Sequence, residues 1–367
     1  MGALFLDSLE IRNFRAFRHL TIERFGRVNL IVGKNNVGKS CLLEALRLYA
    51  KQGSQALVWE LLEARDETGP RVVRSEEGVK DEVSTVKYLF YGRRDTKEYP
   101  DVIQIGPLNS PETTLTLAVG WYAQVDQEGR RELKPLLPKE YDTVENPVLG
   151  LATQVGTQPK TVQRLSRRSG AIRPPDVKGT PNVFVSANGL EDIQIGQLWD
   201  GIALTDLEED VLASLHIIAS EVQRVNLVGD QSYQRYRYPI VRVAGSDAPI
   251  PIRNMGEGMN RIFGVALALV SAREGVLLID EIESGLHYSV QSELWRLIFA
   301  VAHRLNIQVF ATTHSWDCIQ AFQQAAQGDE HEEGLLIRLE SKMDSTLATL
   351  FGERKLGIAT REQIEVR

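Results

Sequence analysis

The sequence GKNNVGKS, residues 33–40, matches the pattern G-x-x-x-x-G-K-[S/T] at every fixed position. A short β-branched run over residues 27–32 precedes it, and leucines at helical spacing follow over residues 40–49. A strand, a glycine-rich loop and a helix in this order are typical of a phosphate-binding loop, because backbone N–H groups and the positive end of the helix dipole face the phosphate oxygens. A chance glycine loop is the alternative, and the flanking elements argue against it.

The residue types in this loop indicate a nucleotide and a divalent cation as ligands. Lys39 is expected to neutralise the β- and γ-phosphates of ATP, and the Ser40 hydroxyl is expected to bind Mg²⁺. The predicted nucleotide-binding residues of the loop are Gly33, Lys34, Asn35, Asn36, Val37, Gly38, Lys39 and Ser40.

A second motif, VLLIDE over residues 276–281, places two acids after four apolar residues. Such a run predicts a buried strand, and ligands gather at the carboxyl ends of strands in open α/β sheets. Asp280 is predicted to hold Mg²⁺, directly or through water. Glu281 is predicted to orient or deprotonate the attacking water. The alternative is a buried strand that ends in a solvated acidic turn.

The composition indicates the size of the hydrophobic core and the cellular compartment. Its 367 residues, 43% hydrophobic and 25% charged, are enough for a sizeable core without disulfides or metals. Cys41 and Cys318 have no metal-ligand spacing, which favours a reducing, cytoplasmic location. No signal peptide is recognisable and every apolar run is too short to span a bilayer, so no membrane partner is expected.

The net charge of −7 argues against a broadly basic surface, but a nucleic-acid partner stays open because a local basic stripe is sufficient. The densest basic stretch is Arg164 to Arg173. No aromatic side chain is interleaved in it for base stacking, which favours a solvated basic loop.

Hydrophobic patterning divides the chain into residues 1–52, 53–180 and 181–367. The first and last parts alternate apolar strands and helices, as in a mostly parallel sheet covered on both faces, and so indicate the α/β class. The middle part carries many prolines, charge clusters and β-like segments over 83–91 and 113–125, and we interpret it as an inserted, β-rich lobe.

Three further elements are predicted in the last part of the chain. Residues 206–223 and 257–273 have the apolar spacing of helices, and residues 334–351 have the pattern of a β-hairpin.

Several motifs occur in a fixed order along the chain. They are Asn13-Phe14-Arg15, the loop at 33–40, the sequence DEIESGLH over 280–287, and Thr312-Thr313-His314-Ser315. In this order they resemble the ABC-type ATPases of the OLD and RecF kind, the AAA15 and AAA21 type, which are relatives of SMC proteins. The resemblance covers residues 1–50 and 250–320, and it implies an ABC-type P-loop fold with an antiparallel β lobe and an inserted lobe.

The resemblance also implies roles for individual residues. Arg15 would lie near the phosphates, and the segment 283–287 would communicate across a dimer. His314 would be the switch histidine that senses the γ-phosphate and, with Glu281, a catalytic residue. A lone histidine at the end of a strand is more often structural, but the Thr-Thr-His-Ser context favours a functional role.

The signature segment departs from the family pattern Leu-Ser-Gly-Gly-Gln. Gly258 keeps the glycine at the helix start, but Gly256 replaces the serine and Glu257 would repel phosphate if it pointed inward. Gly256 and Gly258 are nevertheless the predicted nucleotide-binding residues of this segment. The glutamine loop has three candidates, which are Gln154, Gln158 and Gln163.

The leading hypothesis is an ATPase that forms a homodimer or higher oligomer around nucleotide and regulates a separate effector. Fewer than about sixty residues follow His314, so no appended Toprim nuclease of the OLD type is expected, and the effector would be another chain, such as a nuclease. By analogy, anti-phage defence or DNA repair is the setting. The alternatives are a nucleotide-gated sensor or scaffold with little turnover, and the ATPase subunit of a membrane transporter.

Overall fold

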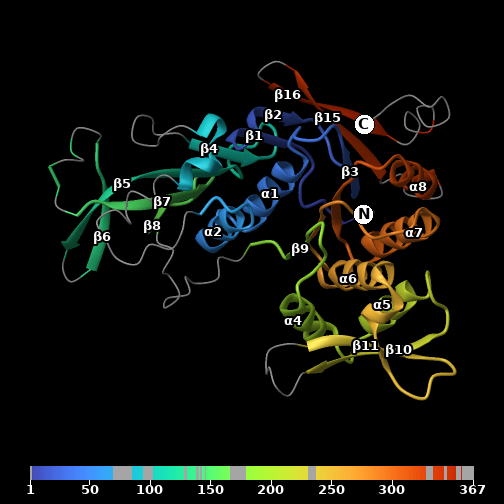
Figure 1. Cartoon of the computed structure of the whole chain (residues 1–367). Coiled ribbons are helices and arrows are strands. Elements are labelled where there is room, and N and C mark those ends of the chain that lie inside the picture. Colours follow the sequence, from blue (N-terminus) through green and yellow to red (C-terminus); the bar gives the residue numbers. More distant parts are fainter. Residues whose placement is uncertain are drawn as a thin grey trace.

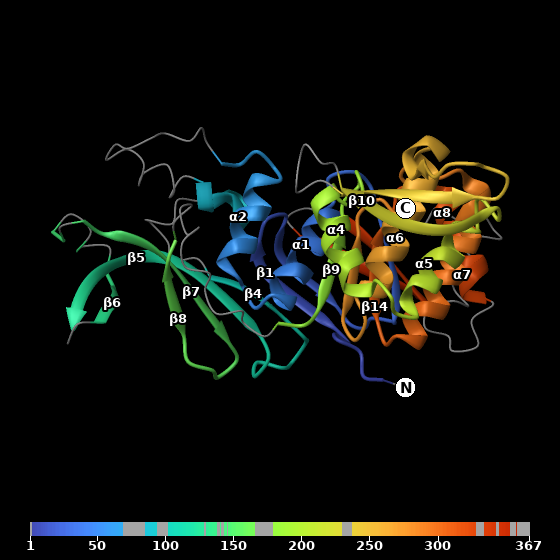
Figure 2. The ribbon, with the colours of Figure 1, turned by 90° about the horizontal axis from the view of Figure 1, so that it is seen from below.

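The computed structural model describes residues 2–68, 85–93, 102–127, 130–137, 140, 143–144, 146–165, 179–229, 237–327, 334–342, 345–352 and 357. The molecule is elongated, with an antiparallel sheet at one end and a helix-covered, mostly parallel sheet at the other (Figure 2). The basic stretch after Leu165 lies outside the described residues.

The six-stranded sheet has the order β16-β15-β3-β14-β13-β9, in which β16 alone runs antiparallel to its neighbour. Its strands, in chain order, are β3 (Val28–Val32), β9 (Asn182–Val185), β13 (Val276–Ile279), β14 (Gln308–Thr312), β15 (Gly334–Lys342) and β16 (Ser345–Gly352). The predicted hairpin over 334–351 is β15 and β16, and the mostly parallel α/β class is confirmed.

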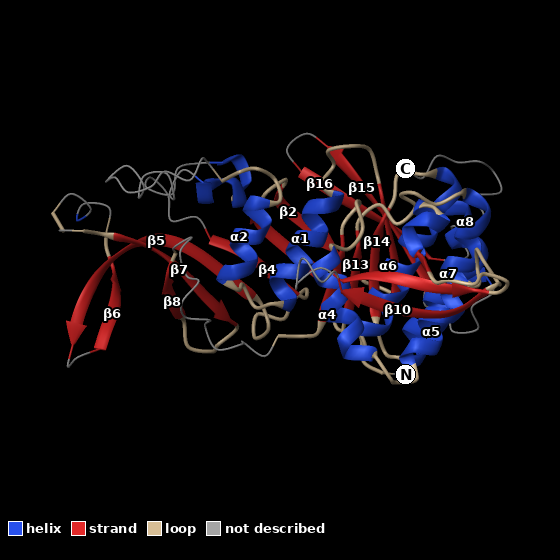
Figure 3. Cartoon of the chain, turned by 60° about the horizontal axis from the view of Figure 1, so that its bottom comes forward, coloured by secondary structure: helices blue, strands red, loops and turns tan. Residues whose placement is uncertain are grey.

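Helices cover both faces of this sheet (Figures 1 and 3). Alternate strand residues enter different cores, since Leu277 packs with the helices of one face and Leu278 with those of the other. The helices of the first core include α6 (Glu257–Ser271), α7 (Tyr288–Arg304) and α8 (Trp316–Gln327), and those of the second include α1 (Lys39–Ala50) and α2 (Gln55–Glu63). Burial on both faces explains why the strands read as continuous apolar runs.

The second sheet is antiparallel and has seven strands, in the order β2-β1-β4-β5-β7-β8 with β6 paired to β5. Its strands are β1 (Leu9–Phe14), β2 (Phe17–Ile22), β4 (Val102–Gly106), β5 (Leu115–Gln127), β6 (Arg130–Pro135), β7 (Val148–Val155) and β8 (Thr161–Arg164). Because β4 pairs with β1, strands from the predicted inserted lobe 53–180 extend a sheet that begins in residues 1–52. The strand expected over 113–125 is β5.

The third sheet is small and lies beside two helices at the edge of the molecule (Figure 1). Its strands are β10 (Val222–Gly229), β11 (Arg237–Val243) and β12 (Ile250–Pro251), and the helices are α4 (Asp192–Ile202) and α5 (Leu207–Leu215). The helix expected over 206–223 therefore ends at Leu215, and α4 was not predicted. Residues after Leu215 leave the helix because the apolar Val222 begins a strand that pairs with β11.

The β-like reading of 83–91 is wrong for its described part. Two short 3-10 helices, η1 (Lys87–Leu89) and η2 (Tyr91–Arg93), occupy this region instead. Val86 has a φ of −67° and a ψ of −23°, which are helical rather than extended values, and Phe90 makes an isolated bridge to Phe14.

Candidate nucleotide-binding and hydrolysis site

The loop at residues 33–40 connects β3 to α1, as predicted. Gly33 has a φ of 147°, and a Cβ there would lie 2.5 Å from the carbonyl oxygen of Leu339. Gly38 has a φ of 108°, and a Cβ there would lie 2.7 Å from the ring of Phe17. Both positions therefore require glycine, for backbone conformation and for space.

Lys39 begins α1, and its side chain folds back over the loop. Its Nζ donates to the carbonyl oxygen of Gly33 at 2.8 Å and to that of Lys34 at 3.3 Å. Burial lowers the pKa of Lys39, and the nearby carboxylates of Asp280 and Glu281 act in the opposite direction. A partly desolvated ammonium held by neutral carbonyls is well suited to bind an anion.

Ser40, Asp280 and Thr312 form a hydrogen-bonded unit of oxygen atoms. The Ser40 hydroxyl donates to Asp280 Oδ2 at 3.0 Å, and the Thr312 hydroxyl donates to Asp280 Oδ1 at 2.5 Å. The parallel register that opposes Ile279 to Ala311 places Asp280 beside Thr312. The two predicted Mg²⁺ ligands are thus in contact, whereas Thr312 was not predicted to take part in the site.

Glu281 follows Asp280 in the left-handed region, with a φ of 47°. Its backbone N–H donates to the Thr312 hydroxyl at 2.9 Å, while its carboxylate is 43% exposed. A non-glycine residue held in this conformation stores strain, and such residues cluster at functional sites. The result is an exposed carboxylate directly beside the Ser40–Asp280 pair.

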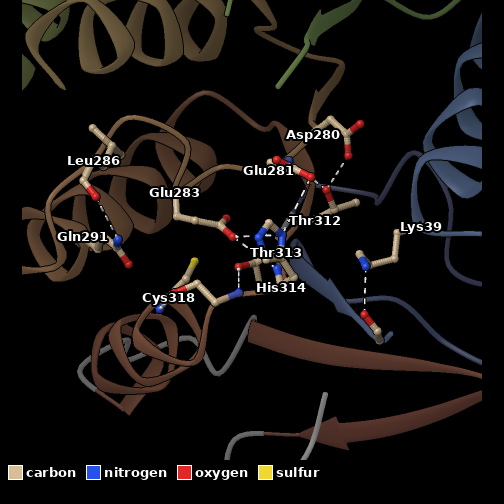
Figure 4. Close-up of polar contacts among 12 residues, drawn as sticks. Lys39, Asp280, Glu281, Glu283, Leu286, Gln291, Thr312, Thr313, His314 and Cys318 are labelled. Atoms are coloured by element: carbon tan, nitrogen blue, oxygen red, sulfur yellow. Dashed lines mark hydrogen bonds and ion pairs between the residues drawn. The ribbon is translucent and has the colours of Figure 1, made fainter. Parts of the chain in front are cut away.

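His314 lies between two carboxylates (Figure 4). Its Nδ1 is 3.7 Å from Glu281 Oε1 and 3.6 Å from Glu283 Oε1. Glu283 Oε1 also accepts the backbone N–H of His314 at 3.2 Å, and the Glu283 side chain is only 11% exposed. The buried Glu283 therefore positions the histidine next to Glu281.

A cavity of about 780 Å³ joins these groups into one site. It is lined by Arg15, Ala16, Asn35, Asn36, Gly38, Lys39, Ser40, Cys41, Arg65, Glu67, Tyr88, Phe90, Gly92, Arg93, Asp280, Glu281 and His314. A volume of this size is in the range of small-molecule and cofactor sites. The structure therefore brings the loop, the acidic pair and His314 together from the two ends of the chain.

Arg15 lines the same cavity, but its side chain already has protein partners. Its guanidinium pairs with Glu44 and with Glu67, the latter at 2.9 Å, and donates to the carbonyl oxygen of Leu61 at 3.2 Å. Burial raises the pKa of Glu44, and Arg15 and Arg65 oppose that rise. Direct contact of Arg15 with phosphates stays a prediction.

Known families match both halves of this site. Residues 5–90 match the family described as AAA ATPase domain, and residues 200–317 match the one described as AAA domain, putative AbiEii toxin, Type IV TA system. The chain is similar to an ATP/GTP phosphatase of Helicobacter pylori (strain ATCC 700392 / 26695), with 24% identity over 384 residues that cover 95% of this chain and 96% of that protein. A 50-residue stretch is 48% identical to an uncharacterized protein of Methanocaldococcus jannaschii, covering 13% of this chain and 23% of that protein.

Among solved structures, an Smc head bound to the C-winged helix domain of ScpA has a TM-score of 0.50 at 14% identity, over 96% of this chain and 99% of that one. The family models and the phosphatase relative support an AAA-type ATPase, and the likeness to the Smc head shows the ABC-type fold. The resemblance drawn from the motifs and the ABC-type P-loop fold are both confirmed. Membership of the OLD subgroup stays a prediction.

The signature segment opens α6. Gly256 is the N-cap of the helix, and a Cβ on Gly258 would lie 3.4 Å from the carbonyl oxygen of Gly285. Within the described residues, neither glycine lines the cavity that contains Lys39. Contact of these glycines with a nucleotide therefore requires a second subunit, and it stays a prediction.

Arg261 on α6 was not predicted to have a role, and it ties the signature helix to the acidic motif. Its guanidinium donates to the carbonyl oxygens of Ser186 at 2.7 Å, Asp280 at 3.0 Å and Glu281 at 2.8 Å. Burial lowers the pKa of Arg261, and the acids around it oppose the change. The spacing Gly-x-Gly-x-x-Arg was the sequence signal for this residue.

The three glutamines considered for the glutamine loop lie elsewhere. Gln154, Gln158 and Gln163 line a separate cavity of about 430 Å³ between the start of α2 and the antiparallel sheet.

In the described part of the chain no helix is long and apolar enough to cross a membrane. The described residues also contain no cluster of three or more His, Cys, Asp or Glu side chains placed to bind a metal.

Proposed function

We propose that this chain binds ATP together with Mg²⁺, hydrolyses it, and dimerises around the nucleotide to control a separate effector. One observation carries the proposal: Lys39, the Ser40–Asp280 pair, Glu281 and His314 line a single cavity. The relative described as an ATP/GTP phosphatase, which aligns over nearly the whole chain, supports the same activity.

The oxygen atoms at the end of the phosphate-binding loop fit Mg²⁺. A hydroxyl and one carboxylate are the protein ligands that Mg²⁺ takes when substrate phosphates and water complete its shell, so a cluster of three acids is not needed. Ser40 and Asp280 would hold the ion, which when bound neutralises phosphate charge. Thr312 fixes the Asp280 carboxylate through its hydroxyl.

The other residues of the cavity have separate roles in binding and hydrolysis. Lys39 stabilises the negative charge of the phosphates, and Glu281 accepts a proton from the attacking water or orients it. His314, held by Glu283, contacts the γ-phosphate and reports its presence. Measuring phosphate release from ATP by the purified chain in Mg²⁺ tests the proposal, and absence of turnover under all conditions would contradict it.

Dimerisation predicts a specific effect at Gly258. An arginine at this position would place a long side chain where the signature segment faces a partner's phosphates, so Gly258→Arg should impair hydrolysis and ATP-dependent association but retain ATP binding. Gly258→Ala is the matched control, because its Cβ would make only ordinary contacts, the nearest at 3.4 Å. Phosphate release and mass in solution with ATP provide the readouts. Full activity of a strictly monomeric protein would contradict the two-subunit mechanism.

We further propose that the effector binds the lobe within residues 53–180, in DNA-related work such as anti-phage defence or DNA repair. The β6 end of this lobe lies far from the parallel sheet (Figure 1), and Leu137 just after β6 is 55% exposed. Nucleotide-driven closure of the ATPase subunits would carry this lobe with it.

The effector proposal predicts that Leu137→Asp keeps ATP turnover near the wild-type rate and prevents a native partner from co-purifying. Val102→Asp is the matched control, because Val102 is also an exposed apolar residue, at 37%, but lies on β4 near the ATPase core. Affinity purification from the native host, followed by phosphate-release assays, provides both readouts. Cleavage of DNA by the purified chain alone in Mg²⁺ or Mn²⁺ would refute a separate effector.

A further inference from the structure

Strands β10 and β11 of the three-stranded sheet expose most of one face. In the register of β10 and β11, Arg224 lies opposite Arg242, Asn226 opposite Ile240, and Val228 opposite Tyr238. These six residues share a face because side chains two apart point to the same side of a strand. Of the six, only Ile240 is half-buried and the others are exposed, whereas Leu227 and Val241 on the opposite face are buried in the core.

Among the described residues of this face, the charged side chains are all positive. Arg224 and Arg242 are directly opposed, an arrangement of like charges that destabilises a strand pair, and neither has a carboxylate partner among the described residues. Neither β10 nor β11 contains an acidic residue. On the other face, by contrast, Arg237 pairs with Asp200 of α4. The acids nearest along the described chain are Glu221 and Asp247, just outside the strands.

An aromatic ring accompanies the two guanidinium groups. Tyr238 is 40% exposed and Val228, opposite it, is 38% exposed. An exposed ring with an apolar neighbour provides a flat surface, and the two arginines, which have no carboxylate partner in the described part of the chain, provide cationic donors on the same sheet face. This combination of stacking surface and positive charge is the one that single-stranded nucleic acids require. Phosphates between the two arginines would also relieve their mutual repulsion.

The sheet is connected to the ATPase site through the backbone. β12 pairs with β11, continues directly into η4 (Ile252–Met255), and η4 ends at Gly256, the N-cap of α6. Arg261 of the same helix holds the carbonyl oxygens of Asp280 and Glu281. Only β12 and η4 therefore separate a ligand on this face from the signature helix α6 along the chain.

We infer that the exposed face of β10 and β11 binds single-stranded nucleic acid, with Arg224 and Arg242 on the phosphates and Tyr238 stacked on a base. The inference goes beyond the proposed function and does not depend on hydrolysis. Unlike the basic stretch after Arg164, this face combines arginine with an exposed aromatic side chain.

The test uses the full chain and fluorescently labelled single-stranded DNA and RNA oligonucleotides, with binding followed by anisotropy over a series of salt concentrations. The double variant Arg224→Glu, Arg242→Glu should bind at least ~10-fold more weakly, and its salt dependence should fall by about 1.4 log units per log unit of salt for two lost contacts. Tyr238→Ala should weaken binding about 10-fold, and Tyr238→Phe should restore it, because stacking needs only the ring.

A matched charge reversal at Arg18 and Arg273, two exposed arginines outside this face, should leave oligonucleotide binding near wild type. Basal phosphate release should persist in every variant, which separates this result from a failure of the ATPase assignment. If the wild type binds neither oligonucleotide, or if the Arg224 and Arg242 variant binds as tightly as the Arg18 and Arg273 control, the inference is wrong.

Discussion

Lys39→Ala is expected to abolish ATP binding, with an affinity loss of at least ~100-fold, while the protein stays folded. The substitution removes the cation that meets the phosphates, and charge-assisted hydrogen bonds of this kind are among the strongest in proteins. Among the described residues the Nζ donates to two carbonyl groups of its own loop, so its loss should change the free energy of unfolding by less than about 1 kcal/mol. Calorimetric titration with ATP and thermal unfolding measure the two effects.

Lys51→Ala is the control for this substitution. Lys51 is an exposed lysine that caps the other end of α1, so it tests whether loss of any positive charge from this helix weakens ATP binding. We expect the control to bind ATP as the wild type does. Unchanged ATP affinity in a folded Lys39→Ala protein would remove the phosphate-binding role from residues 33–40.

Glu281→Gln is expected to retain ATP binding and to slow hydrolysis by about 10²-fold, the usual contribution of a positioned base. Glutamine has nearly the same shape, and the backbone N–H bond to the Thr312 hydroxyl at 2.9 Å does not involve the side chain. The change therefore removes the charge and the proton acceptor without moving the site. An ATP-bound dimer should accumulate, visible as a doubled mass in solution.

Glu293→Gln provides the matched control, because Glu293 is an exposed carboxylate on α7 whose partner is Arg296 on the same helix. Its phosphate release should equal that of the wild type. Wild-type turnover in Glu281→Gln would show that another group activates the water, and Glu283, which also faces His314, would be the first to examine.

The phosphate-binding loop and the acidic pair were recognisable from the sequence because each is a local pattern with one backbone solution. Gly33 and Gly38 hold φ values that other residues rarely adopt, and a strand that is buried on both faces must be apolar throughout, as residues 276–279 are. Both motifs depend on residues that are adjacent in the sequence. The sequences of residues 33–40 and 276–281 were therefore sufficient to predict the fold class and a nucleotide ligand.

The small sheet shows where local patterns were insufficient. The apolar spacing over 206–223 fits a helix throughout, yet the chain leaves the helix after Leu215 and Val222 joins β10. Pairing with β11, the next strand along the chain, decides this, and that pairing also places Arg224 and Arg242 side by side on the solvent face.

The tertiary structure alone decided which side chains complete the site. Thr312 reaches Asp280 because β13 and β14 pair in parallel with Ile279 opposite Ala311, a register that no sequence spacing reveals. The Arg261 guanidinium donates to the carbonyl oxygens of the acidic motif, and the Arg15 guanidinium pairs with the carboxylates of Glu44 and Glu67. These contacts join residues that are distant in the chain, and strand pairing together with the packing of helices against the sheets selects them, whereas the motif residues are selected by the local backbone.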